Sequence, residues 1–216
     1  LVNKIDPEKY GFDKWVRISK SAYLEKKKEH SKYAKGTKAP HEGTLNNINI
    51  FIRFSDQSEF TSSRATFDAK FNGVSYSMNS YYNEVSYGML DIATHHYPEV
   101  ENMSTNLSYV DSHPRNYYRP YSAYNTIGYQ DNEQKTIREH TLLKNAIESI
   151  AEEVPDDLDI DGDNDGFVDN VCFVIRGYND GWNDLLWAHR WGLFTYDVSI
   201  NGKQVYDYTF QPEAQN

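Results

Sequence analysis

The sequence is poor in cysteine, in positive charge and in long apolar runs, and each shortage excludes a class of protein. Cys172 is the single cysteine among 216 residues, so no disulfide forms within the chain and cysteine usage does not indicate a compartment. The formal net charge of −10 argues against nucleic acid as a partner, because phosphate binding needs a basic surface. No apolar run approaches the roughly 20 residues that cross a bilayer, so we expect no membrane span.

Charge divides the chain into two parts. Residues 1–38 carry 11 Lys or Arg against 5 Asp or Glu, whereas residues 39–216 carry 11 against 27. We interpret residues 1–40 as a basic N-terminal appendage, either a solvated helix or linker or a propeptide-like segment, with a binding patch as the alternative. Residues 41–216 are long enough to form one domain with its own core.

Hydrophobic periodicity predicts an α/β or α+β layer fold. We expect strands over residues 47–54, 90–96, 168–176 and 205–211, and helices over residues 66–71, 78–85 and 136–154. The apolar run that contains Cys172 is expected to be buried on both faces of a sheet. Residues 102–131, rich in Tyr, Asn, Ser and Pro, are expected to be mostly loop. This order of elements is typical of a sheet with flanking helices.

Five aspartates crowd into residues 159–169, in the stretch DIDGDNDGFVD. Like charges this close repel one another unless a cation lies between them. Their spacing matches the first nine positions of an EF-hand loop, with Gly166 at the sharp turn of the sixth position. The pattern predicts a Ca²⁺ site with the ligands Asp161, Asp163, Asp165, the Phe167 carbonyl and Asp169, the last binding directly or through water.

The twelfth position departs from the EF-hand pattern. It holds Cys172 where an EF-hand has a bidentate Glu, and a strand is expected after the loop in place of a helix. The remaining ligand would then come from elsewhere in the chain or from water. An all-oxygen set favours Ca²⁺ over zinc, which prefers His and Cys. The alternative is an acidic, solvent-exposed turn without a metal.

Four segments, in order along residues 44–212, share features with one family. They are NINIFIRFSDQSEF from residue 47, SYYNEVSYGMLD from residue 80, DGDNDGFVDNVCFVIRGYNDG from residue 161 and LWAHRW from residue 186. Together they resemble the immune-inhibitor-A-like family of secreted bacterial zinc metalloendopeptidases. The resemblance implies a zincin-like mixed sheet with flanking helices, a secreted or cell-surface location, and a protein or peptide substrate. The segment over residues 205–211 would run near the cleft, where extended substrates bind by β-pairing.

The sequence departs from that family at the zinc site. Family members carry His-Glu-x-x-His on a helix, where two histidines bind zinc and the Glu acts as general base. None of the seven histidines here is followed by another four residues later, and the adjacent His95 and His96 would point to opposite faces of a strand. We therefore expect the N-terminal part of a peptidase domain, cut before its zinc-binding helix, with zinc only in a longer parent protein and no activity in this chain alone. The alternative is a degenerate relative that never had zinc.

Two further interpretations stay open at this point. His189 either faces the substrate cleft or assists zinc, or it packs structurally between Trp187 and Trp191 with its ring nitrogens hydrogen-bonded. From a different functional class, the chain is a non-catalytic, calcium-dependent module that binds glycan or protein through exposed tyrosines. No signal peptide is visible, but the chain begins at Leu1 instead of Met, which leaves a secreted origin open.

Overall fold

A computed structural model describes residues 39–214 together with residues 21, 22, 24, 25 and 28. The interpretation of residues 1–40 as an appendage therefore lies almost entirely outside the described residues. The strands are β1 (Gly43–Phe54), β2 (Leu90–Tyr97), β3 (Tyr109–Asp111), β4 (Val171–Tyr178), β5 (His189–Gly192), β6 (Ser199–Ile200), β7 (Lys203–Gln204) and β8 (Asp207–Ala214). The helices are α2 (Arg64–Phe71), α3 (Met78–Val85) and α4 (Asn132–Ile150), with 3₁₀ turns η2 (Arg115–Tyr118) and η3 (Ala151–Glu153).

The main sheet is mixed. Its strands follow the order β2-β1-β4-β8-β5, and β3 pairs with β1 beyond the end of β2. The pairs among β2, β1, β4 and β8 are parallel, whereas β5 runs antiparallel to β8 at the edge. A separate hairpin is formed by β6 and β7. The expected fold class, a mixed α/β sheet with flanking helices, is confirmed.

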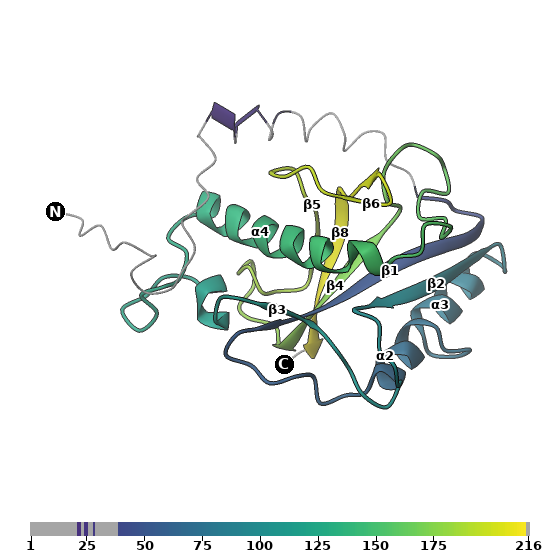
Figure 1. Cartoon of the computed structure of the whole chain (residues 1–216), viewed down its shortest axis with the longest axis horizontal. Coiled ribbons are helices and arrows are strands. Elements are labelled where there is room, and N and C mark those ends of the chain that lie inside the picture. The colour runs from purple at the N-terminus through teal and green to yellow at the C-terminus, as the bar shows by residue number, and fades with distance from the viewer. Residues whose placement is uncertain (1–20, 23, 26–27, 29–38, 215–216) are drawn as a thin grey trace.

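Helices cover both faces of this sheet, as Figure 1 shows. One face packs against α4 and forms the larger core, which includes Ile48, Ile50, Ile52, Phe54, Leu142, Leu143, Ala146, Ile147, Ile150, Phe173, Ile175, Tyr208 and Phe210. The opposite face packs against α2 through a smaller core of Phe51, Phe60, Phe67, Cys172 and Val174. The alternation of Ile50, Phe51 and Ile52 between the two cores follows from the two-residue period of a strand.

The structure matches most of the expected elements and shifts some of their ends. Helix α3 has the expected bounds, and Ser77 caps it as a capping box. Helix α4 begins earlier than its apolar periodicity indicates, because the Asp131 side chain accepts a 2.7 Å hydrogen bond from the Gln134 N–H and forms the N-cap. Strand β8 starts after residues 205 and 206, and the predicted loop over residues 102–131 also holds β3 and η2.

Cys172 lies inside the sheet, as expected from its apolar surroundings. Its side chain is buried against Phe51 and Phe67, and burial raises the pKa of the thiol to about 11. Because a thiolate and not a thiol is the nucleophile, we expect Cys172 to react with a thiol reagent only on unfolding. The measurement is the labelling rate in native buffer against that in denaturant. Labelling at the same rate in both would contradict this placement.

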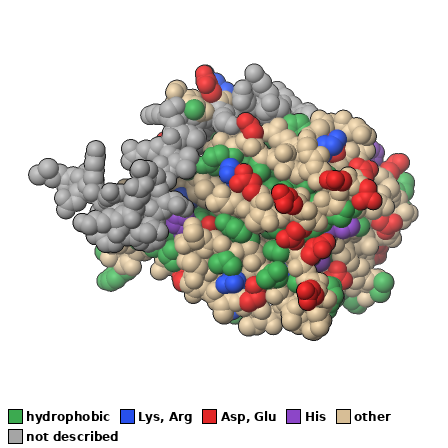
Figure 2. Space-filling view, in the orientation of Figure 1, with side chains coloured by type: hydrophobic (Ala, Val, Ile, Leu, Met, Phe, Trp, Pro, Cys, Tyr) green, Lys and Arg blue, Asp and Glu red, His purple; other side chains and the backbone are tan. Residues whose placement is uncertain are grey.

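No helix in the described part of the chain is long and apolar enough to cross a membrane. Acidic side chains are spread over the face that carries α4 and toward the right-hand end of the molecule in Figure 2. This distribution agrees with the net charge of −10.

Candidate functional site

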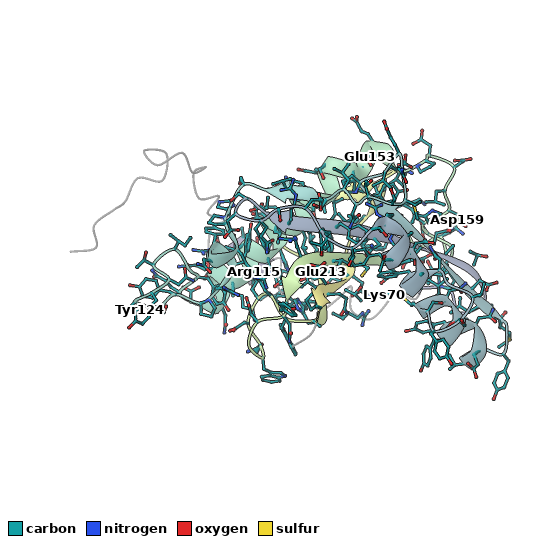
Figure 3. All side chains as sticks on the ribbon, turned by 90° about the horizontal axis from the view of Figure 1, so that it is seen from below. Lys70, Arg115, Tyr124, Glu153, Asp159 and Glu213 are labelled. Carbon is teal, nitrogen blue, oxygen red and sulfur yellow. The ribbon has the colours of Figure 1, made fainter. Side chains whose placement is uncertain are left out.

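The acidic loop, residues 159–169, connects η3 to β4 and is anchored on both sides. The Asp169 N–H donates to the Ile160 carbonyl at 2.8 Å, which closes the base of the loop. The Val168 N–H donates to the Gln204 backbone carbonyl at 2.9 Å, and the Gln204 N–H donates to the Gly166 carbonyl at 2.9 Å. These bonds join the loop to the β6–β7 hairpin. Figure 3 shows Asp159 near the end of the molecule opposite Tyr124.

The structure brings the carboxylates of Asp161, Asp163 and Asp165 together. One oxygen from each lies within 4.8 Å of the others. Asp161 accepts from the N–H groups of Asp165 at 2.9 Å and Gly166 at 3.1 Å, and Asp163 accepts from the Asp165 N–H at 3.1 Å. Gly166 has φ +90°, a conformation that L side chains rarely adopt, which explains a glycine at this turn. The loop therefore curls around its own aspartates.

Asp169 and Phe167 supply the other two expected ligands, and the Asp169 carboxylate is not one of the three that converge. The Asp169 carboxylate accepts a 2.9 Å hydrogen bond from the Gly162 N–H, which holds it across the loop. The Phe167 N–H donates to Asp165 at 2.9 Å, so the Phe167 backbone follows directly on the cluster. Asp169 and the Phe167 carbonyl thus remain predicted ligands.

Lys203 is a member of the site that the sequence pattern missed. Its ammonium donates to Asp161 Oδ2 at 2.6 Å from the start of β7. Burial alone would raise the pKa of Asp161, which is only 3% exposed, but Lys203 and the Gly166 N–H lower it on balance. The same hydrogen bond raises the pKa of Lys203. One carboxylate of the cluster therefore has an internal counter-ion.

Two other carboxylates of the loop, those of Asp169 and Asp165, have raised pKa values. Burial raises the pKa of Asp169 to about 6, and the charges of Asp163 and Asp161 act in the same direction. Burial and the same two neighbours also raise the pKa of Asp165. A divalent cation would relieve this repulsion, because it interacts favourably with each ionised carboxylate.

The donor chemistry of the loop fits a hard cation. All the side chains of the cluster offer oxygen, which suits Ca²⁺ and does not suit zinc. Within residues 39–214, no other group of three or more His, Cys, Asp or Glu side chains converges in this way. His95 bonds to Asn46 at 3.0 Å and His96 to Asn49 at 2.9 Å, so these adjacent histidines do have separate partners. The described residues do not fit a catalytic zinc.

His189 has both ring nitrogens occupied. Nδ1 lies 2.8 Å from the Trp187 carbonyl, and Nε2 lies 2.7 Å from Glu139 on α4. The ring stacks on Trp187, with centroids 6.0 Å apart and planes 15° apart. The ring nitrogens are hydrogen-bonded as the structural interpretation expects, but the ring packs on Trp187 alone of the two tryptophans, because Trp191 contacts His140 and Phe194.

Glu139, His189 and Tyr208 form a buried network between α4, β5 and β8. The Tyr208 hydroxyl donates to the same Glu139 oxygen that bonds to His189. Burial would raise the pKa of Glu139, but its contacts with His189 lower it on balance. Burial would lower the pKa of His189, and the bond to Glu139 raises it on balance. Both shifts favour an ion pair that ties the edge strand to α4.

Strand β5 forms one edge of the main sheet, and no further strand pairs with it among the described residues. The Leu193 N–H donates to Tyr206 at 2.7 Å, in register with the pairs of Trp191 with Tyr208 and His189 with Phe210. Since hydrogen-bonded pairs alternate in an antiparallel ladder, the backbone groups of Arg190 and Gly192 point away from β8. Strand β8, expected near a cleft, is covered by β5 along residues 207–210, and its residues 211–214 extend past β5.

In comparisons with known proteins, no family model and no curated protein matches this chain.

Proposed function

We propose that this chain is part of a secreted, calcium-braced zinc metalloendopeptidase and that the acidic loop binds Ca²⁺. The observation that carries the calcium half is the convergence of Asp161, Asp163 and Asp165 around the turn at Gly166. The peptidase half rests on the four segments that resemble the immune-inhibitor-A-like family. A mixed sheet with an antiparallel edge strand is compatible with both halves.

Calcium in the loop would act on the sheet through the backbone. Asp169 precedes β4 closely, and Gly166 and Val168 bond to the β6–β7 hairpin that leads into β8. A cation shared by the aspartates would hold the loop, and with it the starts of β4 and β8, in one arrangement. The ion therefore has a bracing role, and Lys203 replaces part of its charge when it is absent.

The edge strand supplies a surface for an extended peptide. An edge presents unpaired N–H and C=O groups, and an added strand satisfies them by β-augmentation. In β5 these outward groups belong to Arg190, which is exposed, and to Gly192, which is buried, so the accessible part of the edge is at Arg190. The Glu139–His189 pair fixes the first residue of this edge against α4. We infer that substrate peptides pair with β5.

Zinc would polarise water and the peptide carbonyl in such an enzyme. The 216 residues carry no His-Glu-x-x-His, so in this proposal its ligands and general base belong to other residues of the parent protein.

The test compares the 216-residue chain with a version extended downstream along its gene. Both are incubated with zinc and an unfolded protein substrate, with and without a zinc chelator. We expect no cleavage by the shorter chain, because a catalytic zinc needs about three protein ligands and a base beside it. The extended chain is expected to cleave until the zinc is removed. Chelator-sensitive cleavage by the shorter chain, or an inert extended chain, would overturn the peptidase proposal.

A second candidate function is a non-catalytic, calcium-dependent binding module. Helix α3 favours it, because the helix has no buried residue and is flanked by Tyr76 and Tyr87, which are 101% and 93% exposed. Both tyrosines have positive φ, at 54° and 58°, which is unfavourable for a residue with a side chain. Exposed tyrosines among Asn and Ser are typical of contact surfaces. An inert extended chain would favour this candidate.

A further inference from the structure

We propose that Trp182 selects peptides with a large apolar side chain at one position of the strand that pairs with β5. The inference rests on the proposed binding of peptide at this edge and adds a specificity to it. It concerns the tryptophan loop, residues 179–188, which connects β4 to β5.

The tryptophan loop is firmly held to the body of the protein. Asp180 accepts from Arg119 Nη2 at 2.7 Å and Nε at 2.9 Å, in a bidentate pair. The Asp180 backbone N–H donates to the Leu186 carbonyl at 3.0 Å, which closes the loop on itself. Lys135 on α4 donates to the Asn183 carbonyl at 2.5 Å. The positions of the side chains on this loop are therefore set by several independent contacts.

Trp182 is nevertheless left in solvent. It is 84% exposed, although Leu185 and Leu186 of the same loop are completely buried. The rings of Trp182 and Trp187 are in T-shaped contact, with centroids 5.5 Å apart and planes 62° apart. An exposed tryptophan costs hydrophobic free energy, and tryptophan is among the residues that contribute most to binding when an interface covers it. An anchored loop that presents such a ring indicates a contact surface.

The ring lies at the end of the proposed peptide edge. Trp187 and His189 are two residues apart along the chain, and their rings stack on each other. Their side chains therefore lie on the same face of the extended segment that leads into β5. A peptide residue paired opposite this stretch places its side chain beside Trp187, because directly opposed side chains on one face are neighbours. Trp182 then forms the second wall of that contact. Two indole rings make a surface for an aliphatic or aromatic side chain.

One of the two carboxylates of the tryptophan loop has a counter-ion. Asp180 is neutralised by Arg119 and lies 3.5 Å from Arg115, and Asp184 accepts from the Tyr129 hydroxyl at 3.4 Å. Asp180 is therefore not left to attract a basic side chain. Asp184 keeps its negative charge, because the tyrosine hydroxyl that it accepts from is neutral. An apolar preference therefore has to come from the exposed Trp182 ring.

The experiment is selection of a displayed library of random extended peptides on the immobilised 216-residue chain. Four proteins are compared: wild type, Trp182→Ser, Trp182→Phe and Tyr124→Ser, the last removing a ring that is 101% exposed in another loop. Wild type and Tyr124→Ser are expected to enrich peptides with an apolar residue at one fixed position. Trp182→Ser is expected to reduce that preference about tenfold, as partial burial of one such side chain implies, and Trp182→Phe to keep most of it.

The outcomes separate this inference from the proposal beneath it. Peptides that bind wild type without a positional preference, or with one that survives Trp182→Ser, would overturn the role of Trp182 and leave the edge strand intact. No peptide binding by wild type would overturn the peptide edge and the inference together. Loss of preference in Trp182→Ser and in Tyr124→Ser alike would also overturn it, since the effect would not depend on this ring.

Discussion

Replacing Glu139 with alanine is expected to lower the free energy of unfolding by about 3–5 kcal/mol, which is typical when one partner of a buried ion pair is removed. The carboxylate is almost completely buried and bonds to both His189 and Tyr208. Its loss would leave two buried polar groups without this partner and would open a cavity under the edge strand. Denaturant unfolding followed by circular dichroism measures the change.

The matched control is Glu148→Ala on the same helix. Glu148 is exposed and pairs with Lys144 one turn away, an interaction worth about 0.3–0.5 kcal/mol. A small loss in Glu148→Ala beside a large loss in Glu139→Ala would assign the effect to the buried network. Equal losses in the two variants would show that helix α4, and not the network, determines the result.

The same network predicts how the difference between these variants depends on pH. Glu139 has a lowered pKa, so its contribution is present above its unfolded value of about 4.3 and is lost as the pH falls through its folded pKa. His189 has a raised pKa, so its contribution is complete below about 6.5 and is lost as the pH rises through its folded pKa. The loss of unfolding free energy in Glu139→Ala relative to wild type should therefore be largest between about pH 4.3 and 6.5.

Removing Ca²⁺ is expected to lower the melting temperature by roughly 5–10 °C. A ligand at one hundred times its dissociation constant adds about 2.7 kcal/mol to the native state. For a chain of this size, each kcal/mol corresponds to about 2–4 °C. Thermal unfolding with excess Ca²⁺ and with a chelator measures the shift.

Two aspartate variants show whether this shift belongs to the acidic loop. Asp163→Ala removes a carboxylate of the cluster and is expected to abolish the difference between calcium and chelator. Asp157→Ala makes the same charge change at an exposed residue just before the loop and is expected to preserve it. A chelator shift that persists in Asp163→Ala would place the responsible ion elsewhere.

Most of the fold could be predicted because its signals are local. The apolar run around Cys172 predicts a strand buried on both faces, and Ser77 predicts the start of α3. The start of α4 was missed although Asp131 is a typical N-cap residue, since the apolar periodicity begins later. Strand β5, four residues long, was not predicted because His189–Gly192 is too short to show alternation.

The candidate site could be predicted only where its residues are close in sequence. The aspartates carry their spacing on the chain, so four of them were expected as ligands of one ion, and three of these lie together. Lys203 follows Asp161 by 42 residues, and His189 follows Glu139 by 50. Such pairs depend on which strands become neighbours in the sheet, and no local pattern in one sequence records that. Trp182 was missed for the same reason, because its significance depends on exposure beside β5.

The most direct test of the central claim is calorimetric titration of the metal-free 216-residue chain with Ca²⁺ and, separately, with Mg²⁺. We expect one Ca²⁺ per chain in wild type and in Asp157→Ala, and no binding in Asp163→Ala. Binding of Mg²⁺ is expected to be weaker, because Mg²⁺ demands near-octahedral geometry and gives up its water reluctantly. Absence of Ca²⁺ binding in wild type, or unchanged binding in Asp163→Ala, would contradict the assignment of the acidic loop as a calcium site.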